Sequence, residues 1–311
     1  MGKTSRDLKI GIIDVSNAPP GTTLERGIRW LERRKIDYRL SPTLMLDEQC
    51  SPLFCQIDRK IEAFMEMLLD ESINVMLPAA GDYGCAAFVH ALDKHLNTIT
   101  DRAGFAGAVC SKVFVVFSDT TALLLYLMRF GARGFYGRNL SIDAGDSSGV
   151  NLVLDWLAKK QCCSHYHVES CSRGEAKGHI LGGDWRVLST MVSTQLCCPI
   201  DGSILFIDNG GGKAWYGNET VFRLLEDIHR MTEGKEIRGL LVGEIKPRVS
   251  SEDLLLSLDM FDFYLSKLNI SGPVALSVPV GHKQLYGLMP LGFDTDIKLS
   301  DDSMLSLAWE W

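Results

Sequence analysis

The chain has 311 residues, of which 46% are hydrophobic and 23% are charged, so it can bury a substantial core and is long enough for two domains. Its net charge of -7 is spread along the sequence, which argues against a nucleic-acid-binding protein. No uninterrupted apolar run reaches the roughly 20 residues that span a bilayer, and residues 1–7 contain no signal-peptide core. We expect a soluble cytoplasmic protein that binds neither nucleic acid nor membrane.

The cysteines favour a reducing compartment. They are odd in number, nine in all, and several lie inside apparent core segments, namely Cys85, Cys110, Cys197 and Cys198. Three further cysteines lie close to two histidines in one stretch, which contains Cys162, Cys163, His165, His167 and Cys171. Because this stretch lacks a C-x-x-C pair, a solvated loop or a strand edge is favoured there over zinc, and we expect no metal site.

The first elements follow the order strand, helix, strand. Residues 8–16 predict a core strand that ends in a polar loop, and residues 23–34 predict a helix whose apolar positions recur every three or four residues. Residues 36–40 predict the second strand. This unit is typical of a parallel sheet.

A loop is predicted at 41–56, an amphipathic helix at 57–69 and a short strand at 73–77. The turn Pro78-Ala79-Ala80-Gly81-Asp82-Tyr83-Gly84 leaves that strand. Glycine has no side chain to block a close approach, so Gly81 suits a pair of backbone N–H donors facing an oxyanion. An ordinary turn is the alternative interpretation.

The sequence pattern changes at Ser118 from that of a strand to that of a helix. Residues 113–117 predict a buried strand, and the run after Thr120 predicts an apolar helix. A serine on such a turn can expose its hydroxyl beside the first amides of the helix, as a nucleophile elbow does, but it can also be a simple N-cap. Val116 and Thr120 stand where the G-x-S-x-G motif has glycine.

The second half alternates strands and helices. A helix near 150–160 and the Cys/His stretch up to residue 176 are predicted to link two domains. Further strands are predicted at 202–209, 239–244 and 273–282, with helices at 219–231 and 250–268. His282 ends its predicted strand beside Gly281, which is the position that a general base reaching across a cleft requires.

The segment Phe117-Ser118-Asp119-Thr120-Thr121-Ala122-Leu123-Leu124 resembles the G-Y-S-D-x-T-A-L nucleophile segment of the LD-carboxypeptidase family of serine peptidases. Its Thr-Thr form is most similar to the branch of microcin C self-immunity peptidases. The resemblance extends over nearly the whole chain, through segments at 78–84, 130–139, 178–188, 202–209 and 273–292. This family implies an α/β fold with two domains, an N-terminal parallel-sheet domain that carries the nucleophile elbow and a C-terminal domain with a mixed or barrel-like sheet.

We expect the N-terminal domain at 1–165 and the C-terminal domain at 166–311, with the site between them. The resemblance implies that Ser118 is the nucleophile, His282 the base and Asp208 the acid. The oxyanion hole would comprise the amide of Gly81 or Asp82 together with that of Asp119. The family implies no metal or cofactor, and a homodimer.

The acid and the substrate contacts depart from the family pattern. Asp208 stands where the family has glutamate, and its side chain is shorter; Glu219 is the alternative acid, although a carboxylate near a helix start is expected for the helix dipole alone. The resemblance suggests Trp185 and Tyr83 as substrate-binding residues. Trp185 could stack on a substrate ring, as immunity peptidases do with an adenine, or merely pack inside the domain.

The resemblance therefore predicts a serine hydrolase that cleaves an amide bond of a small peptide-like or aminoacyl-nucleotide substrate, with a role in detoxification or antibiotic self-resistance. A murein tetrapeptide LD-carboxypeptidase of peptidoglycan recycling is the alternative within the enzyme class. A degenerate member that binds a ligand without turnover is the third interpretation, and the departures at Ala80, Val116 and Asp208 keep it open.

Overall fold

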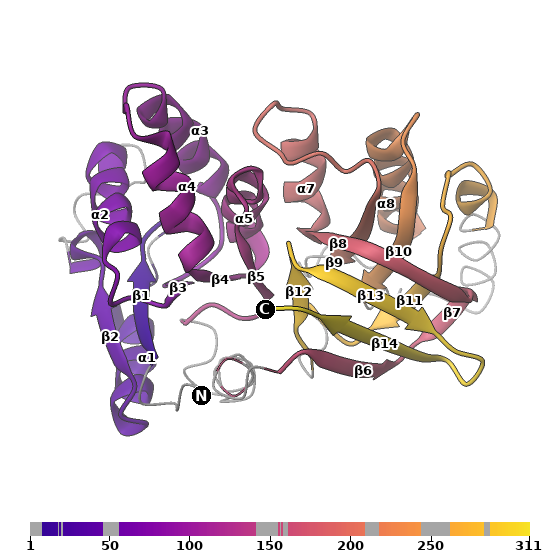
Figure 1. Cartoon of the computed structure of the whole chain (residues 1–311), viewed down its shortest axis with the longest axis horizontal. Coiled ribbons are helices and arrows are strands. Elements are labelled where there is room, and N and C mark those ends of the chain that lie inside the picture. Colours follow the sequence, from indigo (N-terminus) through magenta and orange to yellow (C-terminus); the bar gives the residue numbers. More distant parts are fainter. Residues whose placement is uncertain are drawn as a thin grey trace. The chain divides into compact units, whose positions relative to one another are not determined.

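The computed structural model describes residues 8–17, 19, 21–45, 56–140, 155, 157, 161–208, 218–243, 262–282 and 287–311. These residues form two compact units (Figure 1). Unit 1 comprises Met1–Gln161, Leu196–Cys198 and Tyr286–Gly292, and unit 2 comprises Cys162–Gln195, Pro199–Leu285 and Phe293–Trp311. The boundary expected after residue 165 stays a prediction.

Unit 1 is built on a six-stranded sheet in the order β12-β5-β4-β3-β1-β2. The strands are β1 (Lys9–Ile13), β2 (Asp37–Leu40), β3 (Val75–Pro78), β4 (Val113–Val116), β5 (Arg133–Tyr136) and β12 (Met289–Leu291). Neighbouring strands are parallel except for β12, which pairs antiparallel with β5. The chain runs from β1 outward to β2 and then back to β3, so the strand order reverses between β1 and β3. In such sheets ligands bind at the carboxyl ends of the strands beside this reversal.

Helices pack against this sheet (Figure 1). They are α1 (Gly21–Arg33), α2 (Ile57–Leu69), α3 (Cys85–Leu96), α4 (Arg102–Ser111) and α5 (Thr121–Leu127), with 3₁₀ turns η2 (Pro42–Met45), η4 (Ser118–Thr120) and η5 (Met128–Phe130). The helices predicted at 23–34, 57–69 and after Thr120 are confirmed. Part of the predicted loop forms η2, and the sequence analysis assigned no elements to the region of α3 and α4.

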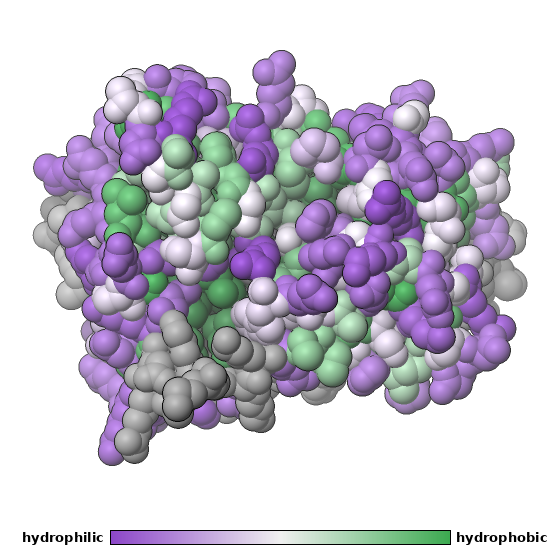
Figure 2. Space-filling model, viewed as in Figure 1, coloured by the Kyte–Doolittle hydropathy of each residue, from purple (hydrophilic) through white to green (hydrophobic). Residues whose placement is uncertain are grey.

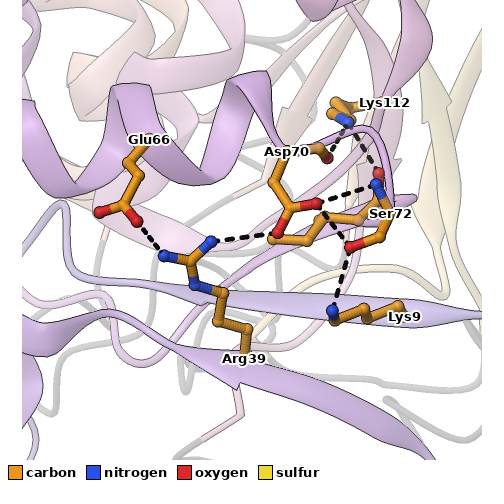
Figure 3. A network of polar contacts seen from close by, with 7 residues as sticks. Lys9, Arg39, Glu66, Asp70, Ser72 and Lys112 are labelled. Carbon is orange, nitrogen blue, oxygen red and sulfur yellow. Dashed lines mark hydrogen bonds and ion pairs between the residues drawn. The ribbon is translucent and has the colours of Figure 1, made fainter.

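A polar network joins the end of α2 to β2 and to the segments that precede β3 and β4 (Figure 3). Arg39 of β2 contacts both Glu66 and Asp70 at the end of α2. The Asp70 carboxylate accepts hydrogen bonds from the backbone and hydroxyl of Ser72, and the buried Lys112 amine donates to the Asp70 carbonyl at 2.7 Å. The network therefore caps α2 and ties it to the sheet.

Unit 2 contains an eight-stranded mixed sheet in the order β6-β14-β13-β8-β9-β10-β11-β7. The strands are β6 (Cys163–His167), β7 (Glu169–Ser172), β8 (Gly174–Asp184), β9 (Ser203–Asp208), β10 (Ile237–Gly243), β11 (Val274–Val278), β13 (Asp294–Leu299) and β14 (Met304–Trp309). The edge strands β6 and β7 are separated in the chain by Val168 alone. The two edges of the sheet therefore come close together at this residue, and of the expected mixed or barrel-like sheet the mixed form is confirmed.

Two outcomes concern segments that contain cysteines. The stretch predicted as a linker, for which a strand edge was one of the expected forms, makes the two edge strands β6 and β7, and exposed and buried residues alternate along β6 as in a strand with one wet face. Cys110, expected in the core, is exposed on α4. The predicted helix at 219–231 is confirmed by α8 (Asn218–Thr232), whereas those at 150–160 and 250–268 lie largely outside the described residues.

The outward face of unit 2 is polar. Exposed and buried residues alternate strictly along β13, and Figure 2 shows many hydrophilic side chains over the front strands of this unit. Among the described residues, no helix is long and apolar enough to cross a membrane.

Candidate active site

Ser118 lies on a strained turn between strand and helix. Phe117 is still extended, with φ -153°, whereas Ser118 has φ +56°, in the left-handed region that non-glycine residues rarely adopt. The chain then enters η4 and α5. A positive φ at a serine between a buried strand and a helix is the backbone geometry of a nucleophile elbow, and Ser118 is half-buried there.

Hydrogen bonds from neighbouring residues hold this turn. The Thr120 hydroxyl accepts from the Phe117 amide at 2.8 Å and lies 2.9 Å from the Phe117 carbonyl. The Ser118 amide donates to the Tyr136 hydroxyl at 3.2 Å. Both Thr120 and Tyr136 are fully buried, so the surrounding structure can maintain the strain at Ser118.

The Gly81 loop lies against the Ser118 turn. A Cβ atom at Gly81 would stand 2.8 Å from the Phe117 carbonyl oxygen, 2.7 Å from Asn139 Nδ2 and 3.7 Å from the Asp119 nitrogen. Only glycine allows this close approach of the two backbones. The structure thus brings together the loop and the amide that the sequence analysis assigned to the oxyanion hole.

Asp82 and Tyr83 are exposed at the tip of the same loop, and 55% of Tyr83 is accessible to solvent. The Tyr83 carbonyl accepts a hydrogen bond from the Asn17 amide at 3.0 Å and lies 3.1 Å from the Ser16 hydroxyl. The loop after β1 therefore supports the loop after β3, at the reversal of strand order.

His282 and Asp208 meet in unit 2. Asp208 is the last residue of β9. His282 lies in the segment after β11, and both its ring and its backbone amide contact Asp208. His282 Nδ1 lies 2.6 Å from Asp208 Oδ2, and the His282 amide donates to Asp208 Oδ1 at 3.2 Å. Asp208 is buried, with 2% of its surface exposed, whereas 18% of the His282 side chain remains accessible. A buried carboxylate that contacts Nδ1 can fix the tautomer of the ring and leave Nε2 as the base.

Gly281 makes this contact possible. Its φ is +127°, and a Cβ atom there would overlap the Asp208 carboxylate. The absence of a side chain at residue 281 therefore lets the backbone of His282 reach the aspartate. The side chain of the alternative acid, Glu219, lies outside the described part of α8.

Asp184 and Trp185 lie beside this pair. Asp184 ends β8 next to Asp208, caps helix α7 (Trp185–Val192) and accepts from the Arg186 amide at 3.0 Å. Burial raises the pKa of the Asp184 carboxyl, Arg186 opposes this shift and Asp208 adds to it. Trp185 is only 4% exposed and borders a groove of about 400 Å³ between α7 and α8. Stacking of Trp185 on a substrate stays a prediction.

The sequence analysis missed Ser16, whose hydroxyl lies 2.7 Å from Asp119 Oδ2. Its position could have indicated this role, because Ser16 is a polar residue at the end of the first predicted strand. Residues that follow parallel strands gather at the same edge of the sheet. No group of three or more histidine, cysteine or acidic residues in the described ranges could hold a metal ion.

Comparison with known proteins gives the family. Residues 10–137 match the model of the LD-carboxypeptidase N-terminal domain, and residues 177–297 match that of the LD-carboxypeptidase C-terminal domain. The chain is 22% identical over 294 residues to a probable murein peptide carboxypeptidase of Bacillus subtilis, covering 91% of this chain and 86% of that protein.

Solved structures share the fold. The muramoyltetrapeptide carboxypeptidase from Oxalobacter formigenes superposes with a TM-score of 0.78 at 22% identity, covering 97% of this chain and 99% of that one. Microcin C7 self-immunity protein MccF, in complex with aspartyl sulfamoyl adenosine, gives a TM-score of 0.73 at 17% identity and covers 100% and 99%. With both family domains matched in order, the chain belongs to the LD-carboxypeptidase family of peptidases.

Proposed function

We propose that Ser118, His282 and Asp208 act as one catalytic triad. The observation that carries the proposal is the 2.6 Å contact between His282 Nδ1 and the buried Asp208 carboxylate. Asp208 holds the ring so that Nε2 takes the Ser118 proton, and the imidazolium that forms is stabilised by the same carboxylate. The strained turn at Ser118 supports the assignment of the nucleophile.

The oxyanion would be received by the Asp119 amide together with the amide of Gly81 or Asp82. The Gly81 loop approaches the Asp119 nitrogen closely enough for two amides to face one oxygen. The serine then forms an ester with the acyl part of the substrate, the leaving amine takes a proton from His282, and water activated by His282 releases the acid.

As the substrate we propose an amide bond in a small peptide-like molecule of the aminoacyl-nucleotide class, with a role in detoxification. The support is the resemblance of the Ser118 segment to the immunity branch and the shared fold with MccF, which was solved with aspartyl sulfamoyl adenosine. Tyr83, two residues after Gly81 in the same loop, offers an exposed ring for contact with the substrate.

Murein tetrapeptides are the second candidate substrate, because a probable murein peptide carboxypeptidase is 22% identical over 294 residues. Incubation with an aminoacyl sulfamoyl adenosine and, separately, with a murein tetrapeptide separates the two by mass spectrometry of the products. Cleavage of the tetrapeptide alone would contradict the nucleotide substrate and leave the triad intact.

Reaction of the purified protein with a fluorophosphonate probe tests the hydrolase itself. We expect one adduct in the intact mass, mapped to Ser118, and no adduct in Ser118→Ala. Turnover of Ser118→Ala should fall on the order of a millionfold with unchanged folding, because the triad acts as a unit. An unlabelled wild-type protein that still binds a candidate substrate would instead establish a non-hydrolytic member.

A further inference from the structure

The Asp119 side chain joins two loops at the reversal of strand order in unit 1. Its Oδ2 atom lies 2.7 Å from the Ser16 hydroxyl and accepts a hydrogen bond from the Cys85 amide at 2.8 Å. Ser16 belongs to the loop after β1, and Cys85 begins helix α3, directly after the loop that carries Gly81. One carboxylate oxygen therefore contacts both segments that flank the nucleophile turn.

The chemistry of these contacts makes them strong. The Ser16 hydroxyl has one proton and two acceptors in reach, the Asp119 carboxylate at 2.7 Å and the Tyr83 carbonyl at 3.1 Å. The shorter contact is to the charged acceptor, where a hydrogen bond is about twice as strong as between neutral groups. The carboxylate also lies at the amino end of the twelve-residue helix α3, where the helix dipole favours an anion.

A buried ion pair holds the Ser16 end of this arrangement. The Lys60 amine of α2 donates to Asp14 Oδ1 at 2.8 Å and to the Ser16 carbonyl at 3.0 Å. Only 9% of the Lys60 side chain and 3% of the Asp14 side chain are exposed. Removing one partner of such a pair would leave an uncompensated buried charge, so the position of the Ser16 backbone is strongly determined.

We propose that the Asp119 carboxylate and the Ser16 hydroxyl are positioning groups that hold the Asp119 amide and the Gly81 loop in register for the oxyanion. This inference rests on the proposed hydrolase function and deepens it. Both side chains are assigned a positioning role and not a contact with the reacting atoms. They act through the backbone, since the carboxylate that anchors both loops belongs to the residue whose amide is an oxyanion donor.

Ser16→Ala is the informative variant, because it removes the hydroxyl at Asp119 Oδ2 and leaves the Cys85 hydrogen bond in place. The matched control is Ser203→Ala, which deletes another buried hydroxyl, bonded to the Ile200 carbonyl at 2.6 Å in unit 2. Near-ultraviolet circular dichroism and a thermal melt establish that both variants are folded.

Two measurements on the full chain decide the inference. In Ser16→Ala we expect the second-order rate of Ser118 labelling by a fluorophosphonate to fall about 10- to 100-fold, as a displacement approaching 1 Å would cause. Amide hydrogen exchange should become faster in peptides covering residues 79–86. Neither quantity should change in Ser203→Ala.

Wild-type labelling and wild-type exchange in folded Ser16→Ala would overturn the positioning role, as would equal losses in the two variants. Absence of labelling in the wild type would contradict the proposed hydrolase. The exchange comparison still decides whether Ser16 and Asp119 hold the loop, so the two failures are distinguishable.

Discussion

The two halves of the candidate triad are positioned in different ways. In unit 1 the Ser118 turn combines a strained backbone, with φ +56° at Ser118, with a local side-chain hydrogen bond from the Phe117 amide to the Thr120 hydroxyl. In unit 2 the base and the acid are 74 residues apart in the chain and meet through a side-chain contact. The first half depends on a strained local conformation that buried neighbours support, and the second on the packing of β9 against its neighbours.

This difference predicts where each half is vulnerable. The Ser118 turn concentrates backbone strain in one residue and relies on buried neighbours to hold it. The long-range pair fails when either of its two chain segments shifts. Substitutions at the acid, at the glycine beside the base and at the strained serine therefore test the comparison, in order of decreasing expected effect.

Among the variants that keep Ser118, the largest effect is expected from Asp208→Asn. Loss of the charge removes the group that orients His282, so turnover should fall by roughly 10⁴-fold while the thermal melt stays close to wild type. Steady-state kinetics provide the measurement. The control Glu219→Gln should change turnover little. The opposite ranking would move the acid to Glu219, and near-wild-type activity in both variants would leave a serine-histidine dyad.

Gly281→Ala tests how closely the backbone beside His282 packs against Asp208. A Cβ atom there would overlap the Asp208 carboxylate, and φ is +127°. We expect the free energy of unfolding to fall by about 3 kcal/mol, from backbone strain and the displaced carboxylate together.

The matched control is Gly174→Ala, in the same unit, where φ is +141° and no atom lies within 4 Å of the added Cβ. This variant carries the strain without the overlap and should cost about 1 kcal/mol in urea unfolding. Equal losses at the two glycines would show that Asp208 and His282 can move apart without cost.

Ser118→Gly tests the backbone strain at residue 118 in unit 1. Glycine adopts a positive φ freely, so the variant should lose activity yet gain about 1 kcal/mol in the free energy of unfolding. Ser303→Gly is the control, since Ser303 has φ +60° in a turn away from the site. A destabilised Ser118→Gly beside a stabilised Ser303→Gly would show that the elbow is not strained.

The smallest effect is expected from Asp70, at the end of unit 1 opposite the nucleophile. Hydrogen bonds from Ser72 lower the pKa of Asp70 to about 2 (Figure 3). Because the pKa is lower in the folded state, this contribution is complete above the unfolded pKa and is lost as pH falls through about 2.

Asp70→Asn should therefore lower the free energy of unfolding by about 1 kcal/mol at neutral pH. The melting temperature of this variant should also fall less steeply with pH at acidic pH, and Ser118 labelling should not change. Ser72→Ala, which removes one donor and keeps the backbone amide of residue 72, should show a weaker form of the same change. An unaltered pH dependence of the melting temperature in both variants would contradict the role of Asp70, and altered labelling would show that the two ends of the sheet are coupled.

The sequence by itself determined the elements whose signal is local. The buried run at 113–117 followed by an apolar helix identified Ser118, and the periodicity of 57–69 gave the bounds of α2. The order and spacing of the family segments then determined the family and the expected two-domain α/β fold. These features can be predicted because strand and helix periods, and short motifs, depend on residues that are adjacent in the sequence.

Only the tertiary structure decided which distant residues meet. Nothing in the sequence shows that Ser16 contacts Asp119, that Lys60 pairs with Asp14 or that residue 281 must be glycine beside Asp208. Likewise, the sequence left the polar Cys/His stretch open between a linker loop and a strand edge, and only the sheet order shows that it forms the edge strands β6 and β7. Such contacts depend on sheet order and on the closeness of two backbones, which local sequence patterns do not encode.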